Sequence, residues 1–314
     1  MSDDGRKVGV IGVPTSAGAF APGQEQAPAA LRDAALVALL RDGGIEVSDY
    51  GDRDVWRWRP DRKRPHAQNL PWVVEIVDDT AARVVESTLA GEITLVLGGD
   101  CTVGVGTVAG HAESADGVGL IYFDLHADLN VPASAPPGAL DWMGMAHMLG
   151  EEGAERELVE AGPRAPLLAP EQVILLGWGP EQARPHERET IARLGLETIS
   201  VDEVRVDPEG AASRTLASLT SRVDRFLVHF DVDVVDFTDT PLSENPGRNE
   251  GIAYEEAAAA LAVLLASPAL AGVTVTELNP NHVEEGAGSI ERLARDLASG
   301  LTGSGVSELE DDDD

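Results

Sequence analysis

Short apolar runs alternate along the chain with segments in which apolar residues recur every three or four positions. The runs, rich in Val, Ile and Leu, predict β-strands at 7–13, 45–48, 93–97, 119–123, 173–176, 197–201, 226–230 and 272–276. The segments between them predict helices at 27–41, 73–90, 181–194, 208–223, 254–266 and 287–301. Strand and helix therefore follow one another throughout the sequence, an order typical of α/β proteins.

The predicted strands show little alternation of polar and apolar residues. Strands that are apolar on both faces are typical of a mainly parallel sheet covered by helices on both sides, so they are expected to be fully buried. We therefore predict an α/β fold with three layers, α/β/α, and about eight strands. No internal repeat or linker-like change of composition is present, which predicts a single domain over 1–306. The acidic segment 307–314 is expected to be disordered.

Composition narrows the functional classes. Of the 314 residues, 43% are apolar, which is enough for a substantial core. The 23 basic and 55 acidic side chains give a net charge of −32, which repels nucleic acids and anionic membranes, so we expect neither as a partner. The longest apolar run, 257–266, is too short to span a bilayer, and the first residues lack a secretory-signal pattern. With one cysteine, these features favour a cytoplasmic protein without an internal disulfide.

One stretch departs from the acidic character of the chain. Residues 53–66 contain six basic side chains and two tryptophans in a predicted loop. A charge run of this kind usually faces solvent or another subunit. The alternative is a docking patch for an acidic partner or for a substrate that carries a carboxylate.

Side chains that bind metals follow four of the predicted strands directly. They are Cys101 after 93–97, Asp124, His126 and Asp128 after 119–123, Asp231 and Asp233 after 226–230, and Glu277 after 272–276. Open α/β sheets present their ligand sites at the carboxyl ends of the strands, so these side chains are expected to converge. In an extended segment residues i and i+2 point to the same side, which lets Asp231 and Asp233 aim at a common point.

A cluster of carboxylates at a buried edge repels itself unless a cation neutralises it. Taken alone, an Asp-x-Asp sequence is more often a turn or a helix cap, and His126 alone fits a core histidine. Four such strand ends together predict a metal site. Oxygen-rich sites with one imidazole suit Mn²⁺ better than Zn²⁺, and several carboxylates can bridge two ions around one hydroxide.

Four short motifs together resemble those of the ureohydrolase family, which comprises the arginases, agmatinases and formimidoylglutamases. The family's GGDHS stands here as GGDCT at 98–102, and DAHxD as DLHAD at 124–128. Its SxDxDxxDP stands as HFDVDVVDF at 229–237, and EVNP as ELNP at 277–280. The resemblance covers nearly the whole chain. It implies a parallel eight-stranded α/β/α domain, a homo-oligomer (trimer or hexamer), and a dinuclear Mn²⁺ centre that hydrolyses a guanidino-type carbon–nitrogen bond of a small molecule.

The resemblance also implies a role for each matching residue. The first ion would be held by residue 101 with Asp124, Asp128 and Asp231, and the second by His126 with Asp124, Asp231 and Asp233. Glu277 would pair with the guanidinium group of the substrate and hold its central carbon over the hydroxide. Asp128 would accept the proton of the hydroxide and deliver it to the departing amine.

Cys101 stands where the family has its first histidine ligand. A thiolate is a softer donor than an imidazole and adds negative charge, so the first site is expected to bind Mn²⁺ less tightly or to prefer a softer ion. Two ions are expected, and one is possible. The alternative is a buried, inert cysteine beside an emptied site.

The loops that follow the motifs also depart from the family pattern. Asp141 stands where arginases have a histidine that shuttles protons, which makes it a further catalytic candidate. Asn130 occupies a position that contacts the substrate's α-carboxylate in the arginase branch, which favours an amino-acid substrate. In the stretch 177–182, where the family bears acids near the α-amino group, Glu181 is the candidate contact. His147 is interpreted as a histidine on a helix surface, with a role in proton transfer as the alternative. The loop 241–247 is altered as well.

These departures leave several functions open. A cysteine in the first ligand position also resembles the Nω-hydroxy-arginine amidinohydrolases, which cleave a hydroxyguanidine to hydroxyurea and ornithine. The first hypothesis is thus a metal-dependent amidinohydrolase for an arginine-like substrate, with or without N-hydroxylation. The alternatives are an agmatinase or formimidoylglutamase-type hydrolase, and a catalytically inactive binding protein with the same fold.

Overall fold

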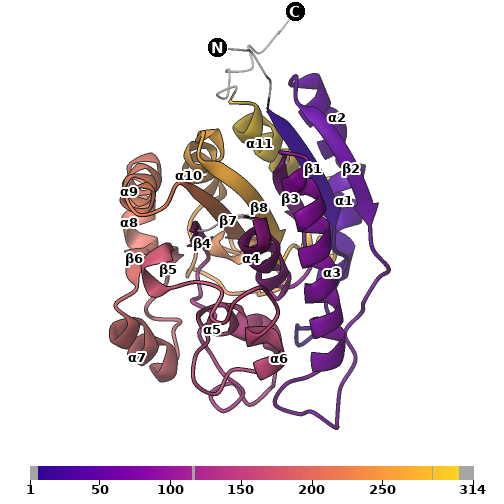
Figure 1. The fold of residues 1–314 in the computed structure, drawn as a ribbon. Helices are drawn as coiled ribbons and strands as arrows, with labels where there is room; N and C mark the ends of the chain where they lie inside the picture. The colour runs from indigo at the N-terminus through magenta and orange to yellow at the C-terminus, as the bar shows by residue number, and fades with distance from the viewer. Residues whose placement is uncertain (1–5, 115–116, 285, 304–314) are drawn as a thin grey trace, which may run out of the picture.

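The computed structural model describes residues 6–114, 117–284 and 286–303, and it contains one sheet of eight strands (Figure 1). The strands are β1 (Lys7–Gly12), β2 (Glu46–Asp52), β3 (Ile93–Leu97), β4 (Val118–Phe123), β5 (Val173–Trp178), β6 (Glu197–Ser200), β7 (Arg225–Asp231) and β8 (Leu270–Thr276). Every pair of neighbouring strands is parallel, and the order across the sheet is β2-β1-β3-β8-β7-β4-β5-β6. The predicted α/β class and the eight predicted strands are confirmed.

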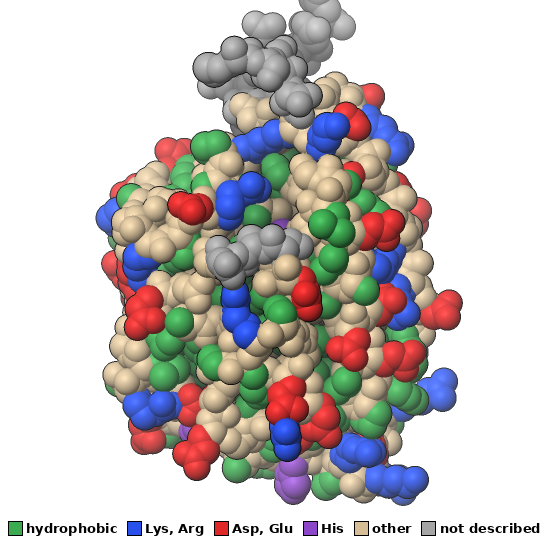
Figure 2. Space-filling view, in the orientation of Figure 1, with side chains coloured by type: hydrophobic (Ala, Val, Ile, Leu, Met, Phe, Trp, Pro, Cys, Tyr) green, Lys and Arg blue, Asp and Glu red, His purple; other side chains and the backbone are tan. Residues whose placement is uncertain are grey.

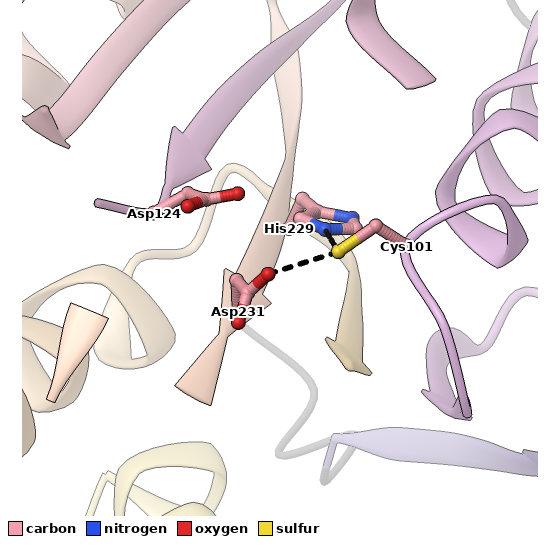
Figure 3. Close-up of side chains that lie close together, drawn as sticks. All are labelled: Cys101, Asp124, His229 and Asp231. Atoms are coloured by element: carbon pink, nitrogen blue, oxygen red, sulfur yellow. Dashed lines mark hydrogen bonds between the residues drawn. The ribbon is translucent and has the colours of Figure 1, made fainter. Parts of the chain in front are cut away.

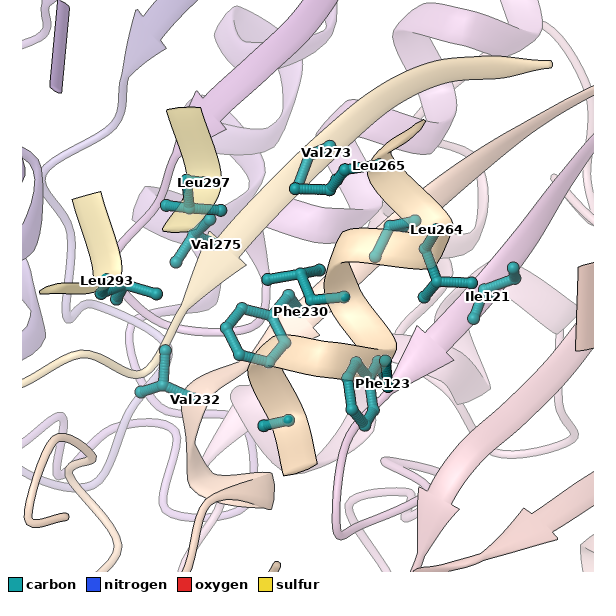
Figure 4. Packing of buried hydrophobic residues seen from close by; sticks show 14 of the residues in the cluster. Ile121, Phe123, Phe230, Val232, Leu264, Leu265, Val273, Val275, Leu293 and Leu297 are labelled. Carbon is teal, nitrogen blue, oxygen red and sulfur yellow. The ribbon is translucent and has the colours of Figure 1, made fainter. Parts of the chain in front are cut away.

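Helices cover both faces of this sheet. The helices are α1 (Ala27–Asp33), α2 (Leu36–Asp42), α3 (Leu70–Leu89), α4 (Val103–Ser114), α5 (Gly144–Leu149), α6 (Arg156–Val159), α7 (Pro185–Leu194), α8 (Val201–Val206), α9 (Pro208–Thr220), α10 (Tyr254–Ala266) and α11 (Ser289–Thr302). One apolar cluster joins the sheet to α1, α2 and α8–α11, and Figure 4 shows part of it around Phe123 and Phe230. A second cluster joins the opposite face to α3–α7. The fold therefore has the three layers predicted.

Burial differs between the centre and the edges of the sheet. All residues of β4 and β8 are buried, as the prediction of fully buried strands requires. That prediction is wrong at both edges of the sheet: all four residues of β6, from the predicted strand 197–201, are only half-buried, and no residue of β2 is buried. The deep strands β3, β8, β7 and β4 are also those whose carboxyl ends carry the predicted site residues.

Two helix predictions need correction. The segment 27–41 forms two helices, because Ala35 between them takes a left-handed backbone with φ 62°. Helices α4, α5, α6 and α8 were not predicted; in α4, glycines lower the helix propensity. Two of these glycines permit close packing on α3: a Cβ at Gly106 would lie 2.7 Å from the Val77 carbonyl oxygen, and one at Gly110 would lie 2.6 Å from that of Ala81.

The basic stretch 53–66 runs over the surface before α3, as predicted. Most of its charged side chains are exposed, and Lys and Arg groups gather at the lower right of the molecule (Figure 2). Arg53 is tied to Asp79 of α3 by an ion pair of 2.6 Å. The predicted acidic tail, 307–314, and the end of the predicted domain at 306 lie outside the described residues. Among the residues described, no helix is both long and apolar enough to cross a membrane.

Candidate active site

The ends of four neighbouring strands bring most of the predicted site residues to one edge of the sheet. Cys101 follows β3, Asp124 follows β4, Asp231 ends β7 and Glu277 follows β8. Because these strands are adjacent and parallel, their carboxyl ends lie side by side. The Cys101 backbone N–H donates to Glu277 Oε1 at 2.9 Å, and its thiol donates to Asp231 Oδ2 at 2.9 Å. Residues 176 positions apart in the chain therefore meet.

Two groups of side chains have the spacing that a metal ion requires. In the first cluster, the ligand atoms of Cys101, Asp124, His229 and Asp231 all lie within 4.8 Å of one another, and all four residues are buried (Figure 3). In the second cluster, those of Asp124, His126 and Asp233 lie within the same distance, and His126 is half-buried. Asp124 belongs to both clusters. Asp231, which was predicted to hold both ions, lies within this spacing in the first cluster only, so the predicted pair of Asp231 and Asp233 is divided between the two clusters.

The first cluster differs from the predicted ligand set in one member. His229 of β7 takes part, whereas Asp128 does not lie within the common spacing. The Tyr122 hydroxyl holds Asp128 instead, donating to its Oδ2 at 2.5 Å. Asp128 still lines the same cavity as Cys101 and Asp231. It is therefore placed to exchange protons beside the first cluster.

Carboxylate oxygens at this edge lack partners in the described part of the chain. Asp124 Oδ2 and Asp233 Oδ1 are buried without a hydrogen bond. Burial and the charge of Asp233 raise the pKa of Asp124 to about 7, against the opposing effect of His126. Burial, Asp233 and Asp124 likewise raise the pKa of Asp231 well above its usual range. Unpaired buried acid oxygens of this kind fit a divalent cation, which would neutralise them.

His126 already supplies part of that neutralisation in the second cluster. Its Nδ1 lies 2.9 Å from Asp233 Oδ2 and 3.5 Å from Asp124 Oδ1. Although burial acts in the opposite direction, both carboxylates raise the pKa of His126 well above its usual value. Burial alone would raise the pKa of Asp233, but His126 lowers it below its usual value. An ion bound here would replace the proton on His126, because a metal-ligating imidazole is neutral.

Two of the predicted catalytic residues have a left-handed backbone, which is uncommon outside glycine. Asp128 has φ 47° and Glu277 has φ 62°. Contacts hold Glu277 in place: besides the Cys101 amide, the Gln24 side chain donates to its Oε2 at 3.0 Å. Strain of this kind persists where surrounding structure enforces it and is concentrated at functional sites.

A cavity of about 260 Å³ opens over both clusters. The predicted candidates Asp128, Asn130, Asp141 and Glu277 line it together with Cys101, His126, Asp231 and Asp233. Asp141 is buried, and burial together with the charge of Glu277 raises its pKa well above the usual range. The predicted contact Glu181 is not brought to the cavity, because its side chain faces solvent and its neighbours Gln182 and Arg184 take that place.

Several residues of this site were missed from the sequence. His229 stands at the first position of HFDVDVVDF, where the family pattern has serine, so this replacement was a usable signal. Tyr122 and Gln24 gave no signal, since they hold Asp128 and Glu277 only through the fold. The interpretation of His147 as a surface histidine is wrong: it is buried in α5, and burial lowers its pKa to about 4. His147 does not line the cavity.

Fold and side chains together define an α/β protein with the donor set of a two-ion centre at one edge of its sheet. A family model described as "Arginase family" matches residues 6–301. The arginase of Brevibacillus brevis is 32% identical over 278 residues, covering 88% of this chain and 91% of that protein. The crystal structure of arginase from Bacillus caldovelox superposes with a TM-score of 0.86 at 27% identity, covering 96% of this chain and all of that one.

The fold is also shared with formimidoylglutamase from Bacillus subtilis, at a TM-score of 0.74 and 19% identity over 98% of this chain and 90% of that one. The chain belongs to the arginase family, the ureohydrolases. The predicted family and enzyme class, a hydrolase of linear amidines, are thereby confirmed. The family depends on two metal ions, typically manganese, and uses small guanidino substrates.

Proposed function

We propose that this enzyme hydrolyses the guanidino group of an arginine-like amino acid whose α-carboxylate binds to Arg184. The observation that carries the proposal is the charge pattern of the cavity. Seven carboxylate side chains line it, and Arg184 is the single Lys or Arg among its described lining residues. A substrate with a cationic guanidinium at one end and an anionic carboxylate at the other matches this pattern, whereas agmatine lacks the carboxylate.

Arg184 and Asn130 form a linked pair on the cavity wall. Arg184 Nη1 donates to the Ser134 carbonyl at 3.3 Å, and the Ser134 hydroxyl donates to Asn130 Oδ1 at 3.1 Å. The latter bond leaves the NH₂ group of Asn130 free to donate elsewhere. The Arg184 guanidinium also lies over the Trp142 ring, 5.4 Å from its centroid. These contacts hold two donors beside one another, as recognition of a carboxylate requires.

The acidic end of the cavity binds the guanidinium group. Both oxygens of Glu277 are fixed by donors of this chain, so its carboxylate is oriented before substrate arrives. Asp128, held by the Tyr122 hydroxyl, accepts a proton from the attacking water and returns it to the leaving nitrogen. When bound, two divalent ions supply charge neutralisation and a water acidic enough to act as nucleophile at neutral pH. Mn²⁺, the ion that the family pattern favours, is proposed for the oxygen-rich second cluster. A homo-oligomer remains a prediction.

The test is substrate discrimination in an Arg184→Met variant loaded with Mn²⁺. Loss of a charge-assisted contact of about 1.5–3 kcal/mol should raise KM for arginine roughly 10- to 100-fold with little change in kcat. Turnover of agmatine should stay unchanged, because agmatine has no carboxylate to lose. Arg193→Met is the matched control, since Arg193 lies on helix α7, which begins directly after Arg184, and pairs with Glu151 outside the cavity. Preference of the wild type for agmatine, or equal losses for both substrates, would contradict the proposal.

Nω-hydroxy-arginine is the second candidate, and Asp141 favours it. This buried carboxyl group lines the cavity, and its charge interacts with Glu277, where the guanidino group is expected to bind. A carboxyl group there can share a hydrogen bond with an N-hydroxyl, which arginine lacks. Comparing kcat/KM for the two substrates in the wild type and in Asp141→Ala tests this. We expect the preference for the hydroxylated substrate to fall about 10-fold in the variant, the size of one hydrogen bond. An unchanged ratio would show that Asp141 does not recognise the N-hydroxyl group, and a wild-type preference for arginine would rule out the second candidate.

A further inference from the structure

Position 101 has lost an imidazole relative to the family pattern, and position 229 has gained one. Both residues are buried, and His229 Nε2 lies 3.4 Å from Cys101 Sγ. The two side chains are 128 positions apart in the chain, yet they occupy one space between β7 and the start of α4. An imidazole at 101 would compete for that space with the ring of His229. The two substitutions therefore form a coupled pair.

We propose that His229 supplies the imidazole ligand of the first ion and that this site, formed by Cys101, Asp124, His229 and Asp231, selects a thiophilic divalent ion such as Zn²⁺ or Co²⁺. The inference concerns the metal centre of the proposed hydrolase and rests on that centre binding divalent ions. The second cluster, with carboxylates and one imidazole, keeps the oxygen-rich character that suits Mn²⁺. The enzyme then holds two different ions.

The orientation of the His229 ring supports a ligand role. The ring stacks on Tyr122, with centroids 4.3 Å apart and planes 7° from parallel. Its Nδ1 faces helix α4, where a Cβ at Gly104 would lie 2.6 Å from it. Its Nε2 faces the opposite way, 3.1 Å from Thr276 Oγ1 and 3.4 Å from Cys101 Sγ. The ring is thus clamped so that one nitrogen is directed at the cluster.

The donors of this site match a soft four-coordinate ion. The cluster offers four donor atoms within 4.8 Å of one another: one sulfur, one nitrogen and two carboxylate oxygens. Zinc binds donors of these three kinds, and its structural sites are four-coordinate and tetrahedral. Asp124 Oδ2 is buried without a hydrogen bond among the described residues, so it has a free lone pair for an ion.

Cobalt spectroscopy tests the ligand set without measuring turnover. Metal-free enzyme in a thiol-free reductant is titrated with Co²⁺, whose bond to a thiolate gives a near-ultraviolet charge-transfer band. Because the chain has one cysteine, such a band can come only from Cys101. We expect the band with the first equivalent of Co²⁺, its loss in Cys101→Ser, and at least a 10-fold weaker affinity of this equivalent in His229→Ala. His111→Gln is the control, because His111 is a buried histidine on α4 that pairs with Thr94 instead.

A reciprocal exchange completes the test. The double variant Cys101→His, His229→Ser restores the family pattern, so it should lose the band and bind Mn²⁺ more tightly than the wild type. Cys101→His alone should bind either ion poorly, because two rings then share one space, and the double variant should reverse that loss.

Absence of the band in the wild type, or a band of unchanged energy and affinity in folded His229→Ala, overturns the proposal. If His229→Ala does not fold, X-ray absorption of the wild type with one equivalent of Zn²⁺ identifies the donor atoms bound to the ion. One sulfur without an imidazole nitrogen overturns the proposal, and one sulfur with one imidazole nitrogen supports it. Since neither readout uses substrate, failure here leaves the proposed reaction standing.

Discussion

The two candidate metal clusters share Asp124 and lie at the same sheet edge, yet the second keeps the residue types of the family pattern and the first does not. The first cluster is buried throughout, whereas the side chain of His126 in the second is 30% exposed. In the buried cluster the side chains are packed against one another, so a substitution that changes the size of one side chain requires a compensating substitution in the side chain that it contacts. Cys101 and His229 are such a pair. The more open cluster has kept His126 and Asp233.

The shared residue offers the strongest way to test whether the clusters are two sites. Asp124→Asn removes a charged ligand from both, so we expect both ions to be lost and activity to fall by at least roughly 10³-fold, as for residues that act as a unit. The metal-free fold should be no less stable, because a buried acid with one unpaired oxygen is removed and the amide oxygen can still accept from the His126 N–H. Metal analysis, turnover and denaturation of the metal-free protein check these points. Retention of one ion at full affinity would mean that the clusters share no ligand.

Removing His126 should separate the clusters. His126→Ala deletes the one imidazole of the second cluster, and we expect the affinity for its ion to fall about 10- to 100-fold or more, the range seen even for outer-shell partners. The Co²⁺–thiolate band of the first cluster should keep its energy. Two-equivalent titrations with Co²⁺ and Mn²⁺ measure both effects in one sample. A shifted band would show that the clusters act as one site.

A packing change away from the ligands should affect the first cluster alone. In Gly104→Ala the new Cβ would lie 2.6 Å from His229 Nδ1, so the ring must move; overpacking of this kind costs about 1–3 kcal/mol. We expect lower stability in urea and a weaker first ion, with the second ion unchanged. Gly144→Ala is the control, because its Cβ would meet the Cys101 carbonyl oxygen at an ordinary 3.6 Å. Equal effects of the two variants would argue against a clamped His229.

The smallest expected effect at neutral pH concerns a buried histidine outside both clusters. Burial, with a smaller effect of Arg225, lowers the pKa of His111 to about 3. Between pH 6.5 and 3 the unfolded chain binds a proton that the folded chain excludes, so His111 destabilises the fold as the pH falls through this window. At pH 5 the contribution is about 2 kcal/mol from the difference in pKa. His111→Gln should therefore lose less stability than wild type between pH 7 and 5 in urea denaturation of metal-free protein, and equal slopes would contradict this.

The features that could be predicted from the sequence are those encoded by a local pattern of residues. Buried strands and the acids that follow them are local patterns, so Asp124, Asp231 and Glu277 were placed correctly at strand ends. Contacts between distant segments carry no such pattern. The approach of His229 to Cys101 and the support of Glu277 by Gln24 depend on strand order. Helix α4 was missed because its glycines serve packing against α3 and His229, which overrides local propensity.

Glu181 and Arg184 show the same limit at the cavity mouth. Both lie in one polar stretch before α7, and the sequence does not say which of them turns inward. The start of α7 at Pro185 decides it, since it leaves Glu181 in an exposed loop and Arg184 at the helix boundary, stacked on Trp142. Substrate contacts on loops are therefore less predictable than metal ligands on strand ends.

The left-handed backbone at Asp128 and Glu277 lowers the stability of the fold at two positions that are proposed to act in catalysis. A non-glycine residue in a sparsely populated backbone region carries about 1–3 kcal/mol of strain, and at both positions the side chain is also a buried acid. Glycine removes the backbone strain and the buried acid, but in Glu277→Gly the Cys101 N–H and the Gln24 side chain lose their acceptor. We therefore expect this inactive variant to melt close to the temperature of the wild type. A screen for thermal stability alone would thus not retain the carboxylate that is proposed to bind the guanidinium group.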